Sequence, residues 1–131
     1  MILRPATDED IDYFFTLRID PVASRMSRRR APTPEEHAAW WAQTKDHRFV
    51  AEVEGAKIGT LRLGADGVVS IIVDPLVRGC GWGPVMLRAL EPYAREVGIH
   101  TMMAEIAYEN TPSQRAFAKA GWSPILFERH V

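Results

Sequence analysis

Arg78-Gly79-Cys80-Gly81-Trp82-Gly83 is the stretch of sequence that decides the fold of this chain. It follows an apolar run, residues 68–73, and precedes an amphipathic segment, residues 84–97, so the order predicts a strand, a glycine-rich turn and a helix. Glycine has no Cβ, so the turn can bring its backbone close to a ligand. The unpaired amides and the dipole at the start of a helix favour an anion, and we therefore predict a phosphate-binding site.

Two other glycine motifs do not fit this stretch. A dinucleotide-binding fingerprint needs its third glycine later and an acidic residue about 20 positions further on. A P-loop needs Gly-Lys-Ser/Thr, which does not follow here. An ordinary tight turn stays open as the alternative. Cys80 likewise has two interpretations, a nucleophile or a small residue tolerated in a tight turn.

The glycine stretch resembles the Arg/Gln-x-x-Gly-x-Gly/Ala motif of the GCN5-related N-acetyltransferase (GNAT) superfamily, in which the loop grips the pyrophosphate of acetyl-CoA. A second stretch, residues 104–110 followed by Ser113, Ala116-Phe117 and residues 119–122, is similar to that family's second signature. The resemblance covers roughly residues 48–123. It implies an α/β (α+β) GNAT fold with a mixed, mostly antiparallel sheet, helices on both faces, and acetyl-CoA as co-substrate.

Composition limits the classes of protein to which the chain can belong. The 131 residues favour a single domain over 1–131, and 47% hydrophobic residues support a core. The net charge of -1 argues against nucleic acid as a partner. No apolar run approaches the roughly 20 residues that span a membrane, and no signal peptide is evident. We expect a cytoplasmic protein without membrane partner or bound metal.

The pattern predicts elements on both sides of the glycine stretch. Strands are expected over residues 1–5, 48–54, 57–63, 68–73, 101–107 and 122–131. The second to fourth of these should form an antiparallel meander. Helices are expected from Thr7 to about Arg18, from Thr33 to about Thr44, over residues 84–97 and over residues 111–121. Residues 22–34 should be irregular, because Asp20-Pro21 ends the first helix.

The resemblance assigns the cofactor site. Main-chain groups near Ile71 and Val73 are expected to pair with the pantetheine arm and with the thioester oxygen. Asn110 is similar to the family's side-chain contact to the cofactor. The loop residues expected at the pyrophosphate are Arg78, Gly79, Cys80, Gly81, Trp82 and Gly83.

Acetyl transfer to an amine also needs a base and a proton for the leaving thiolate. Glu105 is the first choice for the base, because burial in an apolar strand would raise its proton affinity. A structural ion pair or an exposed edge position is the alternative for Glu105, and His37 and His100 are weaker bases. Many relatives carry a protonating Tyr where this chain has Phe117, so we assign the proton to Tyr108 or to water.

The acceptor side is predicted from a basic segment and a tryptophan helix. Arg28 and Arg29 belong to a segment with Arg25 and Arg30 that is either a clamp for an anion or a solvated loop. His37 and Trp41 share a face of the helix that follows. Residues 35–41, which follow the segment Arg18-Ile19-Asp20-Pro21, resemble the amino-terminal part of nucleotide-linked amino-sugar N-acetyltransferases.

The leading hypothesis is therefore acetylation of a small-molecule amine, a nucleotide-linked amino sugar. The alternatives are a protein or peptide amino-terminal acetyltransferase and a non-catalytic acyl-CoA-binding module. We also expect a homodimer, because the closing strand over residues 122–131 lacks a hairpin partner and leaves an open edge.

Overall fold

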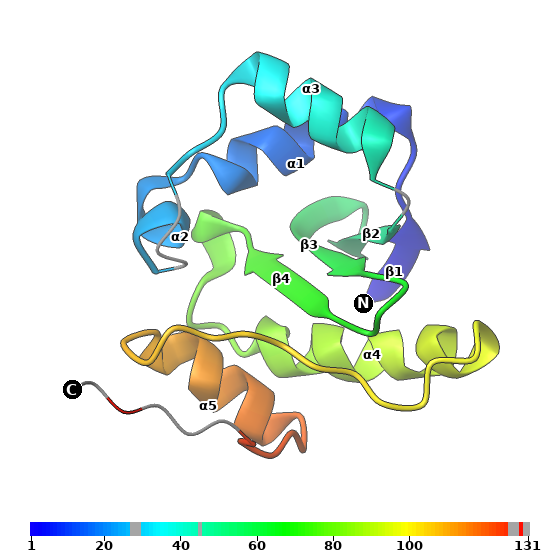
Figure 1. Ribbon diagram of the computed structural model, residues 1–131, viewed down its shortest axis with the longest axis vertical. Coiled ribbons are helices and arrows are strands. Elements are labelled where there is room, and N and C mark those ends of the chain that lie inside the picture. Colours follow the sequence, from blue (N-terminus) through cyan, green and yellow to red (C-terminus); the bar gives the residue numbers. More distant parts are fainter. Residues whose placement is uncertain (27–29, 45, 126–128, 130–131) are drawn as a thin grey trace.

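A four-stranded antiparallel sheet, in the order β1-β2-β3-β4, forms the centre of the computed structural model (Figure 1). The structure describes residues 1–26, 30–44, 46–125 and 129. The strands are β1 (Ile2–Pro5), β2 (His47–Val53), β3 (Ala56–Leu63) and β4 (Val69–Val73). The predicted meander is confirmed, with Phe49 opposite Leu61 and Leu61 opposite Ile71.

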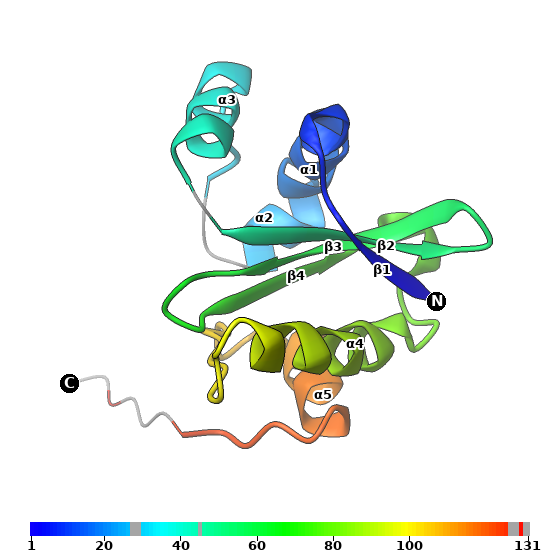
Figure 2. The ribbon, with the colours of Figure 1, turned by 90° about the vertical axis from the view of Figure 1, so that its right-hand side faces the viewer.

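Helices cover both faces of this sheet (Figure 2). The helices α1 (Ile11–Arg18), α2 (Pro21–Met26) and α3 (Pro34–Gln43) lie on one side. The helices α4 (Trp82–Glu96) and α5 (Thr111–Lys119) lie on the other. Two short 3-10 turns, η1 (Asp8–Asp10) and η2 (Pro75–Val77), precede α1 and follow β4. The arrangement confirms the predicted α+β fold with helices on both faces.

The helix starts follow their local sequence. Thr33 accepts a hydrogen bond from the Glu36 amide through its hydroxyl, and Pro34 occupies the first turn of α3. The Thr7 amide donates to the Asp10 carboxylate at 2.8 Å, which fixes the turn before α1. These short-range contacts explain why the sequence predicts both starts correctly.

The main core lies between α4 and the sheet. Met86, Leu87 and Leu90 of α4 are fully buried. They belong to one apolar cluster with sheet residues that include Phe49, Ala51, Leu61 and Leu63. A Cβ on Gly59 would lie 2.6 Å from the Ile72 carbonyl oxygen of β4 and 2.8 Å from the end of the Met86 side chain, so only glycine fits here between β4 and α4.

The segment after Asp20 differs from the prediction. Residues 21–26 form α2 and not an irregular loop. Asp20 explains the difference, because its carboxylate accepts a hydrogen bond from the Ala23 amide at 2.9 Å and so stabilises a new helix start. Pro21 is compatible with this start, since the first position of a helix needs no amide hydrogen bond.

The predicted strand over residues 101–107 is also wrong. This segment meets β4 at one isolated parallel bridge, Val68 with Met103, where the Val69 amide donates to the Met103 carbonyl at 2.7 Å. Residues 122–125, which belong to the predicted closing strand, do not form a strand. Among the described residues, no strand therefore pairs with the side of residues 101–107 that faces away from β4. Residues 126–128, 130 and 131 lie outside the described part.

None of the helices within residues 1–26, 30–44 and 46–125 combines the length and the apolar character that a membrane span requires.

Candidate active site

The glycine stretch forms a sharp turn at the amino-terminal end of α4. Gly79 and Gly81 have φ angles of 76° and 85°, in the left-handed region that other residues rarely adopt. A Cβ at either position would meet no atom of the described residues within 4 Å, so the backbone here is open to a ligand. Gly81 is the N-cap of α4, and the amides of the first helical turn have no partner within the helix.

Gly83 differs from the other two glycines of the stretch. It is buried inside the first turn of α4. A Cβ at this position would lie 3.2 Å from the Ala116 Cβ of α5. Gly83 therefore lets α5 approach α4, while Gly79 and Gly81 shape the exposed turn.

The outer edge of β4 is open next to this turn. The Asp74 amide donates to the Ile58 carbonyl of β3, so alternation along the strand points the peptide groups of Ile71 and Val73 away from β3. Val69, on the same edge, pairs with Met103. In the part of the chain that the structure describes, neither the Ile71 nor the Val73 amide has a hydrogen-bond acceptor.

Arg78 and Cys80 occupy the turn before α4. Arg78 Nη2 lies 2.7 Å from Asp20 Oδ2, and this contact lowers the pKa of the Asp20 carboxyl. Arg78, which the sequence predicts at the pyrophosphate, is therefore paired with the segment between α1 and α2. Cys80 is exposed, and its amide donates to the Val77 carbonyl at 3.3 Å. Trp82 is half-buried and packs against the core.

The residues predicted for catalysis lie on or near the segment that leaves β4 after Met103. Glu105 is exposed, so the burial expected to raise its proton affinity is absent. Tyr108 is 81% exposed. Asn110 caps α5, since its Oδ1 accepts a hydrogen bond from the Ser113 amide at 3.3 Å. Phe117 is buried and packs edge-on against Trp122, with ring centroids 4.7 Å apart.

His37, predicted at a pocket wall or helix rim, is buried between α1 and α3 at 3% exposure. Its Nε2 lies 2.9 Å from the Ile11 carbonyl oxygen, and its Nδ1 lies 2.9 Å from Arg18 Nη1. Burial, more than the nearby arginines, lowers the pKa of His37 and favours the neutral ring. The ring therefore joins the two helices.

The other residues predicted at the acceptor side do not share the contacts of His37. Trp41 is half-buried and donates through Nε1 to Asp8 Oδ1 at 3.0 Å. Arg30 forms an exposed pair with Glu36. Arg28 and Arg29 lie outside the described residues.

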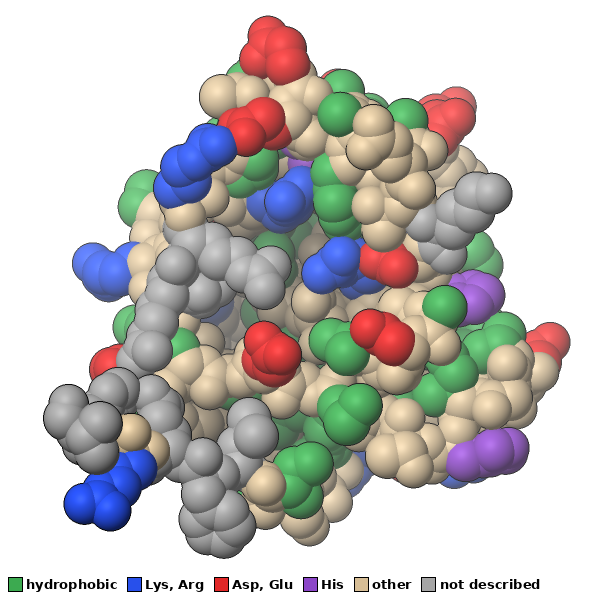
Figure 3. Space-filling model, in the orientation of Figure 1, with side chains coloured by type: hydrophobic (Ala, Val, Ile, Leu, Met, Phe, Trp, Pro, Cys, Tyr) green, Lys and Arg blue, Asp and Glu red, His purple; other side chains and the backbone are tan. Residues whose placement is uncertain are grey.

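A cluster of arginines around Trp40 was not predicted. The guanidinium carbons of Arg18, Arg48 and Arg62 lie 4.3, 4.8 and 5.3 Å from the centre of a Trp40 ring. Basic side chains are visible in the recess between α3 and β4 (Figure 3). The available sequence signal was an arginine within each of two otherwise largely apolar strands, β2 and β3.

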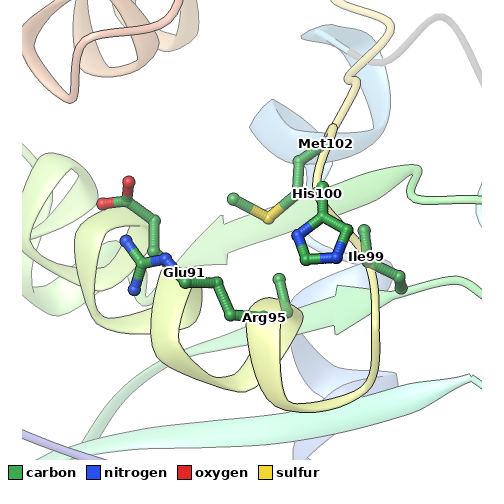
Figure 4. Close-up of a pocket in the computed structure, with 6 residues that line it drawn as sticks. Glu91, Arg95, Ile99, His100 and Met102 are labelled. Carbon is green, nitrogen blue, oxygen red and sulfur yellow. The ribbon is translucent and has the colours of Figure 1, made fainter.

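A pocket of about 220 Å³ lies at the opposite end of α4 from the glycine stretch (Figure 4). It is lined by Glu91, Ala94, Arg95, Ile99, His100 and Met102. His100 is exposed there, far along α4 from the predicted cofactor loop. This pocket is therefore not the cofactor site.

Comparisons with known proteins assign the class of this protein. The model of the acetyltransferase (GNAT) family matches residues 11–122. The "Putative phosphinothricin acetyltransferase YwnH" of Bacillus subtilis (strain 168) is 29% identical, over 94% of this chain and 84% of that protein.

Two solved structures share the fold. The crystal structure of a "putative phosphinothricin N-acetyltransferase" has a TM-score of 0.74 at 28% identity, covering 90% of this chain and 80% of that chain. Aminoglycoside acetyltransferase AAC(6')-Ib in complex with coenzyme A has a TM-score of 0.77 at 19% identity, covering 92% and 83%.

The chain belongs to the GNAT acetyltransferase family. It is an acetyl-CoA-dependent N-acetyltransferase, and the alternative of a non-catalytic binding module is set aside. The resemblance to nucleotide-linked amino-sugar enzymes is not confirmed, since the curated relative carries the name of a phosphinothricin acetyltransferase.

Proposed function

We propose that this enzyme acetylates the primary amine of a small molecule, with acetyl-CoA lying along the open edge of β4. The supporting observation is that this edge ends at the left-handed turn of Gly79 and Gly81 and at the first turn of α4. The pyrophosphate would bind the turn and the helix amides. The Ile71 and Val73 peptide groups would bind the pantetheine arm.

In the proposed reaction the amine nitrogen attacks the thioester carbonyl carbon. A C–N bond forms, the C–S bond breaks, and coenzyme A leaves as the thiolate. A main-chain amide on the β4 edge stabilises the oxyanion of the tetrahedral intermediate. Glu105 takes the proton from the amine, and its exposure leaves the carboxylate accessible to an acceptor. The thiolate receives a proton from Tyr108 or from water.

Two acceptors share the chemistry that we propose. A nucleotide-linked amino sugar carries a diphosphate, and the relatives are named for phosphinothricin, an amino acid that carries a phosphinate. Each combines a primary amine with oxyanions. A peptide amino terminus is the second candidate function, and it needs no such anion.

Free-thiol release from acetyl-CoA tests the proposal. The purified protein is incubated with acetyl-CoA and, in turn, with phosphinothricin, an amino-sugar nucleotide and a short peptide. We expect release with at least one small amine and an acetylated product of matching mass. Acetylation of the peptide alone would favour the second function, and release with none of the three would contradict the proposal.

A further inference from the structure

The Trp40 arginine cluster, which comprises Trp40, Arg18, Arg48 and Arg62, gathers positive charge at one place on the sheet. The three arginines come from α1, β2 and β3, yet each guanidinium lies within 5.3 Å of a Trp40 ring centre. Arg48 also lies 4.2 Å from a Trp41 ring. Cation–π contact favours each of these placements, but it does not neutralise the charges.

The arginines in this cluster repel one another. Arg48 and Arg62 are direct cross-strand partners, and like charges in that position destabilise a sheet. Arg62 is paired with Asp46 at 3.0 Å, whereas Arg48 donates to the neutral carbonyls of Trp41 and Thr44. Among the described residues, Arg48 Nε is buried without a hydrogen-bond partner. Burial is the main cause that lowers the pKa of Arg48; the Asp46 carboxylate opposes this shift, and the charge of Arg62 adds to it by less.

The cluster lies next to the edge on which we place acetyl-CoA. Arg62 Nη2 donates to Ser70 Oγ at 3.2 Å, and Ser70 directly precedes Ile71 in β4. Arg62 keeps 28% of its side chain exposed, so a ligand can reach it. The recess between α3 and β4, in which basic side chains are visible, opens on the same face (Figure 3).

We propose that the Trp40 arginine cluster binds a compact oxyanion of the acceptor, a carboxylate or phosphinate, and so selects small anionic amines over polyamines. This inference rests on the proposed function, because it places the acceptor beside the cofactor edge. An arginine fork matches the two oxygens of such a group. The bound anion relieves the repulsion between Arg48 and Arg62, and the same charges repel a polycation.

Steady-state kinetics with Arg62→Gln test the inference on a matched pair of acceptors. Phosphinothricin carries the anions, and its fully esterified derivative keeps the amine without them. Loss of a charge-assisted hydrogen bond should raise the KM for phosphinothricin by about 10- to 100-fold. The KM for the ester and the KM for acetyl-CoA should change less than about twofold.

Two further variants separate recognition from folding. Arg62→Lys keeps the charge but loses the fork, and its KM for phosphinothricin should lie between those of the parent and Arg62→Gln. Arg95→Gln removes an exposed arginine near the far end of α4 and should leave both KM values unchanged. Calorimetric titration of phosphinothricin in the presence of coenzyme A gives a readout that needs no turnover.

The outcomes distinguish the two proposals. If amines are acetylated but Arg62→Gln keeps the parent preference for phosphinothricin over the ester, the Trp40 arginine cluster does not bind the acceptor anion. The proposed function then still stands. If no amine is acetylated, the proposed function fails and calorimetry decides the cluster alone. Phosphinothricin binding that is lost in Arg62→Gln and kept in Arg95→Gln supports the role of the Trp40 arginine cluster. If the parent protein does not bind phosphinothricin, that role is overturned.

Discussion

Arg78 Nη2 lies 2.7 Å from Asp20 Oδ2, which joins the turn before α4 to the start of α2 on the opposite side of the sheet. The Asp20 carboxylate also accepts the Ala23 amide, so one side chain fixes both segments. A second contact, from the Tyr13 hydroxyl to Asp74 Oδ2 at 2.9 Å, joins α1 to the end of β4. The helices of the acceptor side and the predicted cofactor turn are therefore held together.

Asp20→Asn should loosen the glycine turn without unfolding the protein, because the contact between Tyr13 and Asp74 remains. Asparagine can still accept the Ala23 amide but does not carry the charge that pairs with Arg78. We expect the KM for acetyl-CoA to rise about threefold to tenfold, a change of roughly 1 kcal/mol. An unchanged KM for acetyl-CoA would show that the pair does not position the turn.

Gly81→Ala should weaken acetyl-CoA binding through the backbone. Its φ of 85° is unfavourable for any residue with a Cβ by about 1 kcal/mol, so the turn shifts away from its present shape. Gly55→Ala is the matched control, with a φ of 82°, open space at Cβ and a position in the turn between β2 and β3. Calorimetry should detect weaker acetyl-CoA binding for Gly81→Ala alone, and equal affinities for both variants would contradict the site.

Glu105→Gln should lower kcat and leave the affinity for acetyl-CoA nearly intact, because only the proton acceptor for the amine is removed. Loss of a general base costs about 100-fold or more in rate. Glu96→Gln, an exposed carboxylate at the end of α4, serves as the control. The dependence of kcat on pH should differ between Glu105→Gln and the parent, and identical pH profiles would remove Glu105 from the mechanism.

Asp10 should make stability depend on pH. It is buried at 2% exposure and accepts two hydrogen bonds from Arg4, which holds the pKa of its carboxyl well below the ordinary value. Because the pKa is lower in the folded state, the stabilisation is present above the unfolded value of about 4 and is lost as pH falls below it.

Asp10→Asn should therefore destabilise the protein at pH 7, by roughly 2–3 kcal/mol since Arg4 is one-third exposed. The difference in unfolding free energy from the parent should shrink as pH falls toward 3. The exposed pair of Arg30 and Glu36 provides the control, because Glu36→Gln should have a much smaller effect. If the difference in unfolding free energy between Asp10→Asn and the parent stays constant with pH, the Asp10 carboxylate is not the source of the pH dependence.

The predicted homodimer can be tested independently of the site. One chain of 131 residues has a mass of 14.8 kDa. Light scattering at micromolar concentration should give twice this mass. A mass of one chain across this range would exclude pairing through the closing segment. The expectation comes from the sequence pattern, which predicts an open strand edge that tends to recruit a second chain; residues 122–125 of that segment are not a strand in the structure.

The sequence by itself determined the features that depend on neighbouring residues. The antiparallel meander follows from alternation and short turns, and the start of α3 follows from Thr33, Pro34 and Glu36. The left-handed glycines before α4 follow from a strand, a glycine-rich turn and an amphipathic helix in immediate succession. Each of these signals acts over a few residues, so no knowledge of the distant chain is needed.

Only the tertiary structure decided what depends on distant partners. Glu105 was expected to be buried in a strand, yet residues 101–107 meet β4 at a single bridge, because a strand needs a neighbour that the local pattern cannot specify. His37 is buried because α1 packs against α3, and Arg78 is paired because Asp20 lies opposite it. Arg18, Arg48 and Arg62 meet at Trp40 only after α1, β2 and β3 come together, since electrostatic and cation–π contacts follow distance in space and not separation along the chain.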